Sequence, residues 1–272
     1  MDNSGGHNSG GRSLLIIPVV AAFFLILLPV ALVFWISFFS TSFLAFPPPG
    51  YSLRWYRELL YRTSFVDAAA LSLEIALIST VISVLTGLAA SLALVRLRRG
   101  REFLQTFYLS PLTVPTIVTG IAIYVTFTQM ERLLRLDLVP SMWLMTLGHV
   151  MVLTPTSIRL ITSGLMGLNH SLEEAALNLG ASRFQAFIRV VFPQLRPTIM
   201  AATIFAFIGS FGNLEISLML VSPGHNMLPM ETLNYVLWNM DPTIAALSSV
   251  QVVFIVILLF VVNRLVGLSI VF

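Results

Sequence analysis

One stretch of the sequence, from Leu14 to Phe39, contains no charged residue and is strongly apolar. It exceeds the about 20 residues that an α-helix needs to cross a bilayer. A cleaved signal peptide is the alternative, but the run is too long for the apolar core of such a peptide and lacks a clear small-residue cleavage site. We therefore expect an uncleaved membrane span.

Five more apolar runs follow, so the sequence predicts six transmembrane helices. They lie at about Ala68–Val95, Phe107–Thr128, Val139–Ser163, Pro197–Val221 and Thr243–Val262. Lipid offers no hydrogen-bond partner to the backbone, which leaves helices as the way for such runs to cross. The predicted fold class is an all-α integral membrane bundle of six transmembrane helices.

Composition excludes several kinds of chemistry. Hydrophobic residues make up 57% of the 272 residues and charged residues only 10%, against about 25% charged in soluble domains. Cysteine is absent, which rules out disulfides and thiolate metal sites. All 15 basic residues are arginine, so no phosphate-binding loop with its lysine can form. We expect no cofactor in this chain, and any ATP with its Mg²⁺ to be held by another chain. The net charge of +3 gives no nucleic-acid signal.

The chain divides into three predicted parts. Residues 1–12 are rich in Gly, Ser and Asn and are expected to form a disordered cytoplasmic tail. Residues 13–67 hold the first span and an outer loop, in which a short amphipathic helix would place Trp55 and Tyr56 at the headgroups. Residues 68–265 form the core domain.

Arginine distribution predicts the orientation of the spans. If the N-terminus lies in the cytoplasm, ten of the arginines fall in inner segments and five in outer ones. This excess inside indicates that both termini are cytoplasmic. Within the second span, small residues recur at every fourth position and predict close helix packing: Ser79, Ser83, Gly87 and Ser91.

The polar segment Asn169–Pro193 lies between the fourth and fifth spans. Ser171 with Glu174 has the pattern of a capping box that starts a helix, and Gly180 is suited to end it. Ser182 with Gln185 would start a second helix, which Pro193 would end. On spacing alone, an ordinary helical connector explains the segment equally well.

Residue types and spacing in this segment resemble the EAA loop of binding-protein-dependent ABC importers. The resemblance implies a six-helix permease of the type I importer kind, whose loop at 171–193 is a coupling helix docked in a cleft of a cytoplasmic ATP-binding subunit. It also implies two further partners, a second permease subunit and an extracytoplasmic solute-binding protein, and a location in the cell inner membrane. The residues expected to couple to the ATPase are Glu173, Glu174, Ala175, Ala176, Gly180, Ala181 and Pro193.

Three other segments are similar to the second permease subunit of the spermidine/putrescine branch. They are Leu53–Tyr56, Ser110–Pro115 with Gly120, and Asp241–Ala246. This similarity implies a polyamine-like solute and a heterodimeric permease. The chain departs from relatives of that branch after Phe211, where Gly212-Asn213 stands in place of acidic residues and the carboxylate comes at Glu215.

Few ionisable residues fall within the predicted spans, and such residues normally face the bundle interior or water. We expect Glu74 to be solvated near the outer end of its span and His149 to be a packed polar residue. For Glu215 three roles stay open: a position on the solute pathway, a structural hydrogen-bond partner, or exposure at a helix end. The predicted translocation residues are Ser210, Asn213 and Glu215.

Two other classes of function compete with the permease of an ATP-driven importer. A self-contained secondary transporter or channel would show inverted repeats and more intramembrane charges, and no convincing repeat is visible. A membrane enzyme needs clustered catalytic side chains, whereas the four histidines are scattered. We therefore expect a permease subunit that is not itself an enzyme.

Overall fold

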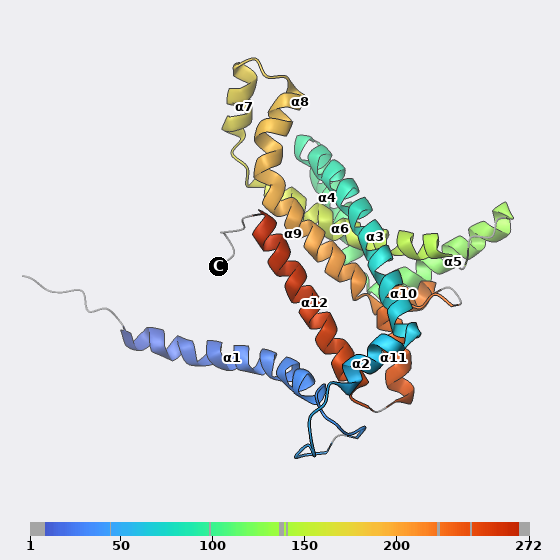
Figure 1. Ribbon diagram of the computed structural model, residues 1–272. Coiled ribbons are helices and arrows are strands. Elements are labelled where there is room, and N and C mark those ends of the chain that lie inside the picture. Colours follow the sequence, from blue (N-terminus) through green and yellow to red (C-terminus); the bar gives the residue numbers. More distant parts are fainter. Residues whose placement is uncertain are drawn as a thin grey trace, which may run out of the picture. The chain divides into compact units, whose positions relative to one another are not determined.

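A computed structural model describes residues 9–43, 45–97, 99–135, 139, 141–221, 224–239 and 241–266. Helices dominate this part of the chain (Figure 1). The α-helices are α1 (Ser9–Ile36), α2 (Arg54–Tyr61), α3 (Thr63–Arg96), α4 (Arg101–Leu109), α5 (Thr116–Leu134), α6 (Met142–Met166), α7 (His170–Asn178), α8 (Arg183–Ala186), α9 (Phe192–Phe211), α10 (Leu214–Leu220), α11 (Leu228–Trp238) and α12 (Thr243–Val266). A 3₁₀-helix, η1 (Ser110–Thr113), and a π-helix, η2 (Phe187–Val191), complete the set. Residues 1–8 of the predicted tail lie outside the described residues, and residues 9–12 are helical.

Five helices in the described ranges are long and apolar enough to cross a membrane. They are Ile16–Ile36, Thr63–Arg96, Met142–Met166, Arg183–Phe211 and Thr243–Arg264. A sixth span is possible if Arg101–Thr113 and Thr116–Leu134 count as one, although they are bent by 100° where they meet. The all-α membrane fold is confirmed.

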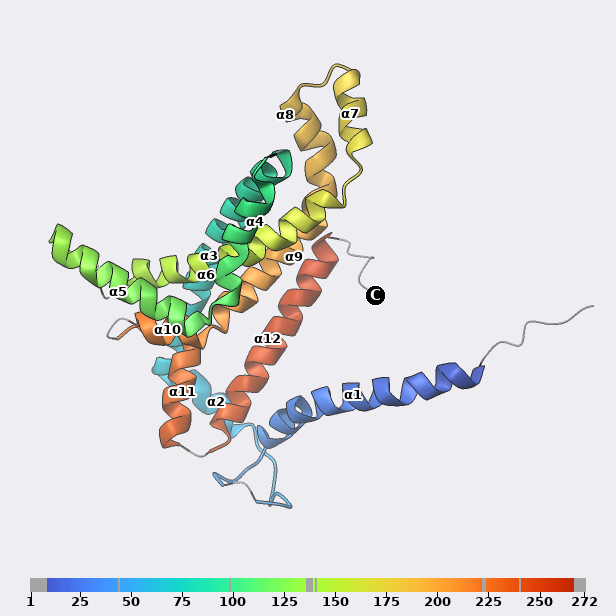
Figure 2. The ribbon, with the colours of Figure 1, turned by 180° about the vertical axis from the view of Figure 1, so that it is seen from behind.

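The predicted third span, Phe107–Thr128, is not a continuous helix. Its first part ends in η1, and Val114 at the junction is extended, with ψ 131°. Pro115 explains this conformation, because a proline disfavours helical backbone in the residue before it. In Figure 2 the chain turns sharply between α4 and α5. The prolines indicate an interruption of this span, and the structure shows that the interruption is a sharp bend.

The chain forms two compact units, Met1–Arg62 with Trp238–Phe254, and Thr63–Leu237 with Ile255–Phe272. In the first unit, α2 is the predicted short helix, and its Trp55 is buried in the protein. Its indole Nε1 donates to the Phe39 carbonyl at 2.7 Å. The Tyr56 hydroxyl bonds to Ser37 at 2.6 Å, so both aromatic residues anchor α2 to the segment after α1.

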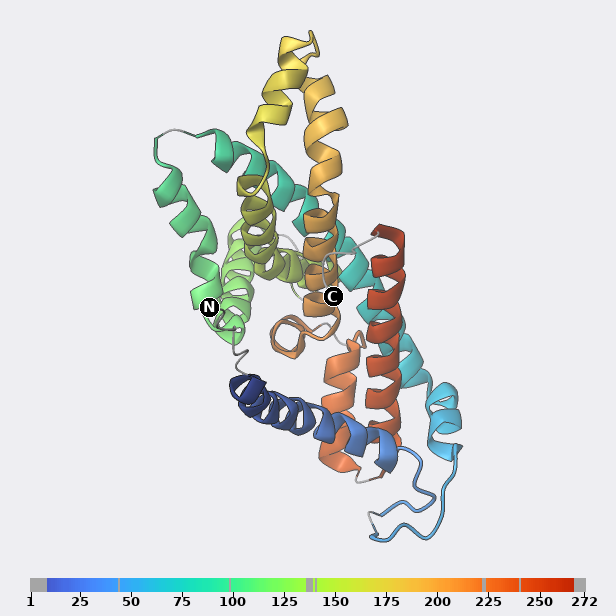
Figure 3. The same ribbon diagram turned by 90° about the vertical axis from the view of Figure 1, so that its left-hand side faces the viewer.

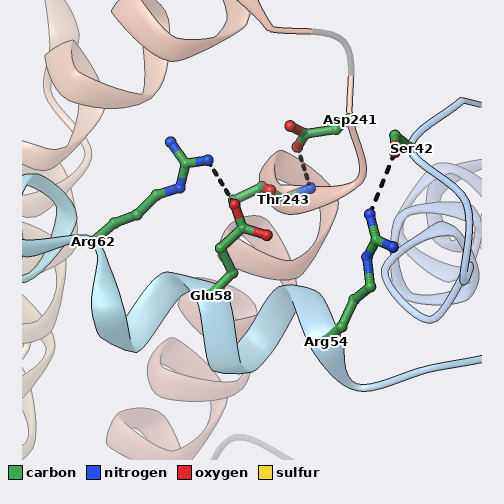
Figure 4. A network of polar contacts seen from close by, with 6 residues as sticks. All are labelled: Ser42, Arg54, Glu58, Arg62, Asp241 and Thr243. Carbon is green, nitrogen blue, oxygen red and sulfur yellow. Dashed lines mark hydrogen bonds and ion pairs between the residues drawn. The ribbon is translucent and has the colours of Figure 1, made fainter.

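Charged side chains of the first unit form polar contacts near the ends of its helices (Figure 4). Arg62 pairs with Glu58 one turn earlier on α2, at 2.6 Å. The Arg54 guanidinium donates a hydrogen bond to the Ser42 hydroxyl at 3.3 Å. The Thr243 backbone N–H donates to the Asp241 carboxylate at 2.9 Å, which caps the start of α12.

In the second unit, α3 and α6 pack along the predicted small-residue stripe. Ser79 donates to the Thr146 carbonyl at 3.3 Å, and Ser91 to the Ile158 carbonyl at 3.1 Å. Between them, a Cβ added at Gly87 would lie 2.7 Å from the Ser157 Cβ. Small side chains therefore let the two backbones approach closely, as predicted.

Two apolar clusters fill the second unit. One joins α3, α6 and α9 around Ile161 and Leu195, both fully buried. The other joins α3, α5, α6 and α10 around Ile75, Met145 and Ile216. These clusters fix the positions of the two segments described next, one at each end of α9.

Candidate functional site

The first candidate segment is the helical hairpin α7–α8, which projects from the end of the helix that continues into α9 (Figure 1). The predicted turn at Gly180 is confirmed, since its φ is +86°. The Gly180 N–H donates to the Leu177 carbonyl at 3.0 Å and the Ala181 N–H to the Ala176 carbonyl at 3.1 Å. This pair of bonds is a Schellman motif, in which glycine takes the left-handed conformation at the lowest cost.

The helix starts of the hairpin agree only in part with the sequence prediction. Asn169, and not Ser171, is the N-cap of α7, and its side-chain oxygen accepts from the Ser171 N–H at 3.1 Å. The predicted capping box Ser171–Glu174 is therefore wrong. The second prediction is confirmed, because Ser182 and Gln185 form a complete capping box at α8.

Pro193 does not end the second helix, contrary to the prediction. The helix widens into η2 and continues as α9, so Arg183–Phe211 is one span. The Phe192 N–H donates to the carbonyl of Phe187, five residues earlier. A proline ring collides with the carbonyl four residues before it and has no N–H to donate. The wider π turn next to Pro193 accommodates both defects, and such turns are frequent at functional sites.

The hairpin leaves much of its surface uncovered within the described chain. Glu174, Ala175 and Gly180 are exposed, whereas Glu173 and Ala176 are half-buried. Leu179 beside the turn is 89% exposed and Phe184 on α8 is 73% exposed. Large apolar side chains exposed together on a projecting segment are typical of a protein-interaction surface.

The second candidate segment is a break at the other end of α9. The helix ends at Phe211, Gly212 is its C-cap, and Asn213 caps a new helix, α10, by accepting from the Ile216 N–H at 2.9 Å. The predicted span Pro197–Val221 is thus two helices. Figure 3 shows the chain turning at this point, where gold passes into orange.

Of the three predicted translocation residues, Ser210 and Asn213 lie at the break between α9 and α10. Ser210 is buried, and its hydroxyl lies 2.9 Å from His149 Nδ1 on α6. Asn213 is half-buried, and its side-chain oxygen is already engaged by the Ile216 N–H as the N-cap of α10. The predicted packing of His149 is confirmed: it is 1% exposed, and its Nε2 is buried without a hydrogen-bond partner among the described residues.

Glu215 lies in the first turn of α10, where a carboxylate is favoured by the helix dipole. Its side chain is exposed and forms no ion pair with any residue in the described ranges. It is therefore not a structural hydrogen-bond partner within this part of the chain. A place on a water-filled route and simple exposure both remain compatible with this position.

Sequence reasoning missed the π turn and the break. The sequence did contain a signal for the break. Gly212 is suited to end a helix, and Asn213 directly after it is suited to be the N-cap of the next one. The π turn had only Pro193 as a signal, and a proline predicts a helix end as readily as a widened turn. No described group of three or more His, Asp or Glu side chains could hold a metal ion.

Known proteins identify the class to which this fold belongs. A family model described as binding-protein-dependent transport system inner membrane component matches residues 83–270. The chain belongs to this family, so it is a multi-pass inner membrane component of a transport system. This membership decides against the secondary transporter or channel and against an enzyme.

Individual relatives agree with the family. Putrescine transport system permease protein PotI of Escherichia coli (strain K12) is 31% identical over 213 residues, covering 78% of this chain and 76% of that protein. Spermidine/putrescine transport system permease protein PotC of the same strain is 27% identical, covering 80% and 81%. The crystal structure of a bacterial ABC transporter for import of the acidic polysaccharide alginate contains a chain with the same fold, with a TM-score of 0.77 at 15% identity, covering 95% and 96%. The predicted ABC importer permease is confirmed.

Proposed function

We propose that this permease moves a small cationic solute of the polyamine kind, using ATP hydrolysed by a separate subunit that docks on the α7–α8 hairpin. The observation that carries the solute class is the similarity to PotI and PotC, both named as polyamine permeases. In the proposal, an extracytoplasmic binding protein delivers the solute. ATP and Mg²⁺ are held by the partner, because this chain has no lysine for a phosphate loop.

The shape of the hairpin supports its role as the ATPase contact. Ala175 is exposed on α7 beside Glu174, so a partner can approach the α7 backbone closely there. The Schellman turn and the capping box close both ends of the Gly180–Ser182 link. A hairpin held in this way moves as one body, and its second helix is continuous with the membrane span that ends at Phe211.

A large side chain introduced on the exposed docking face tests this proposal. Ala175→Trp should abolish uptake while the chain still inserts, because Ala175 has room for a larger side chain in the free chain. Gly180→Val should also reduce uptake, since a β-branched residue is disfavoured at φ +86°. Gly180→Asn is the matched control, because asparagine tolerates this conformation. Uptake and ATPase activity are measured together in reconstituted vesicles, and intact uptake in both Ala175→Trp and Gly180→Val would contradict the coupling role.

The solute pathway is proposed to pass the break between α9 and α10, with Ser210, Asn213 and Glu215 at its polar wall. An exposed carboxylate in a membrane segment is costly unless it meets water or a cation. Glu215→Gln keeps the shape and removes the charge, so uptake of a cationic amine should fall. Glu74→Gln, at an exposed position on α3, is the matched control. Equal uptake kinetics in both variants and the unmodified chain would place Glu215 outside the pathway.

The remaining partners follow from the same proposal. Both termini and the hairpin lie in the cytoplasm, as the arginine distribution favours. A second, non-identical permease subunit completes the route. Membrane lipid or that subunit covers the apolar stripe that α3 exposes opposite its serines, formed by Leu73, Leu77, Val81 and Leu85.

A further inference from the structure

A cavity of about 240 Å³ lies at the base of the α7–α8 hairpin, behind the surface proposed to meet the ATPase. The last turn of α3, the end of α6, the first turn of α7 and the π turn η2 all contribute to it. A single water molecule needs only about 10–15 Å³ of such space. The cavity therefore has room for a ligand much larger than water.

The position of the cavity relates it to the bilayer surface. Three of the contributing helices, Thr63–Arg96, Met142–Met166 and Arg183–Phe211, are long and apolar enough to span a membrane. The cavity is lined by residues near one end of each: Leu92 to Arg96, Leu165, and Phe187 to Gln194. The ends of spans lie at the level of the lipid headgroups. A ligand that is always present at that level is a phospholipid.

The lining combines two opposite charges with an apolar wall. Arg96 and Glu173 both line the cavity, and the side chain of neither forms an ion pair or hydrogen bond with another residue in the described ranges. Gln194 lines it as well; its amide N–H₂ group donates to the Val190 carbonyl at 2.8 Å, which leaves its side-chain oxygen as an acceptor. Leu92, Val95 and Phe187 supply the apolar part.

We propose that this cavity binds the headgroup of a zwitterionic phospholipid that carries a primary amine, of the phosphatidylethanolamine type. The guanidinium of Arg96 is the donor for the lipid phosphate, a pairing for which its fork of N–H groups is suited. The carboxylate of Glu173 and the amide oxygen of Gln194 accept from the lipid ammonium. The start of the acyl chains lies against the apolar wall.

Charge argues against the commoner alternative, an anionic lipid. Pockets that hold anionic headgroups at a membrane surface are basic. Here the Glu173 carboxylate would face the anionic headgroup and repel it. A headgroup ammonium would instead be attracted to this carboxylate and donate hydrogen bonds to it. A headgroup with a trimethylated nitrogen keeps the charge but has no N–H to donate to the carboxylate, so it should bind more weakly than the primary amine.

The bound lipid would join two parts of the permease that the chain itself connects only indirectly. Arg96 ends α3, and Glu173 belongs to α7 in the proposed coupling hairpin. A headgroup that bonds to both holds the hairpin base against the end of a membrane span. This inference concerns lipid binding and holds whichever solute the permease carries.

Native mass spectrometry of the purified full-length chain tests the proposal. The chain is offered phosphatidylethanolamine, phosphatidylglycerol and phosphatidylcholine with identical acyl chains in equal amounts. Phosphatidylethanolamine should be retained preferentially. Arg96→Gln should reduce its retention by roughly tenfold, as expected for a lost charge-assisted bond. Glu173→Gln should remove the preference over phosphatidylglycerol while phosphate binding persists.

Matched variants keep the test decisive. Arg99→Gln removes a nearby arginine that does not line the cavity and should leave retention unchanged. Should Arg96→Gln fail to fold, Val95→Trp fills the cavity from its apolar wall and should displace the lipid. Equal retention of phosphatidylethanolamine and phosphatidylglycerol by the unmodified chain would overturn the proposal, as would equal effects of Arg96→Gln and Arg99→Gln.

Discussion

The contact at Gly87 leaves no room for an added Cβ, and Gly87→Ala should measure how closely α3 and α6 are packed. The new Cβ would lie 2.7 Å from the Ser157 Cβ and 3.2 Å from the Ser157 carbonyl carbon, whereas ordinary contact begins at 3.4 Å. Both atoms belong to a helix, so relief requires the helices to separate by several tenths of an ångström. That separation lengthens the flanking Ser79 and Ser91 bonds to α6.

The expected loss is moderate because two effects oppose each other. Overpacking a core costs about 1–3 kcal/mol, and replacing glycine by alanine in a helix returns about 1 kcal/mol of propensity. The net destabilisation should be about 0–2 kcal/mol, centred on about 1 kcal/mol. In a chain of this size each 1 kcal/mol lowers Tm by roughly 2–4 °C, so thermal unfolding in detergent should show a fall of a few degrees.

A second substitution decides whether the contact is the cause. Ser157→Gly removes the atom at 2.7 Å, so Gly87→Ala with Ser157→Gly should lose less stability than the two single changes together. Coupling between contacting residues is typically 0.5–3 kcal/mol. Ala89→Val adds bulk to an exposed position on α3 and should have little effect. Strict additivity of the two single changes would refute the close-packing argument.

Three further outcomes are expected. Because the chain has no native cysteine, Ser171→Cys should be shielded from an impermeant reagent added outside intact cells and Ser52→Cys should be labelled; the opposite result would reverse the orientation. Asn213→Ala should lower Tm by the equivalent of about 1 kcal/mol through loss of the α10 cap, with Asn213→Asp nearly neutral. Ser210→Ala should cost about 1–3 kcal/mol, because His149 then loses the one side-chain hydrogen bond that it forms among the described residues; an unchanged Tm would show that the bond is not needed.

Apolar length and small-residue spacing were sufficient to predict the spans and the packing of α3 on α6. Both signals are local in the sequence and act directly through the bilayer and through steric size. The turn at Gly180 was also predictable, since its conformation depends on one residue type. The residue types of the hairpin therefore predicted its position, its turn and its second cap.

Interruptions of the spans were less predictable, because their form depends on tertiary contacts. Pro115 bends one span by 100°, whereas Pro193 leaves another continuous through a π turn. Both prolines have the same local preference. The start of α9 lies against the packed Leu195 cluster, while α4 contributes no buried residue to hold its junction straight. Packing, and not the proline itself, decides between a bend and a wider turn.

Helix α9 links the two candidate segments, and its irregular ends suggest how each can move without unfolding it. Its 20 residues extend about 30 Å, close to the thickness of the hydrocarbon core. Within that length Leu195, Ala202 and Ala206 are buried and hold the helix to α3 and α6. The π turn at one end and the Gly212 break at the other interrupt the regular backbone bonding pattern. A shift of the hairpin can therefore be passed along α9 to the start of α10, where Glu215 lies, with the changes in backbone conformation confined to the two ends.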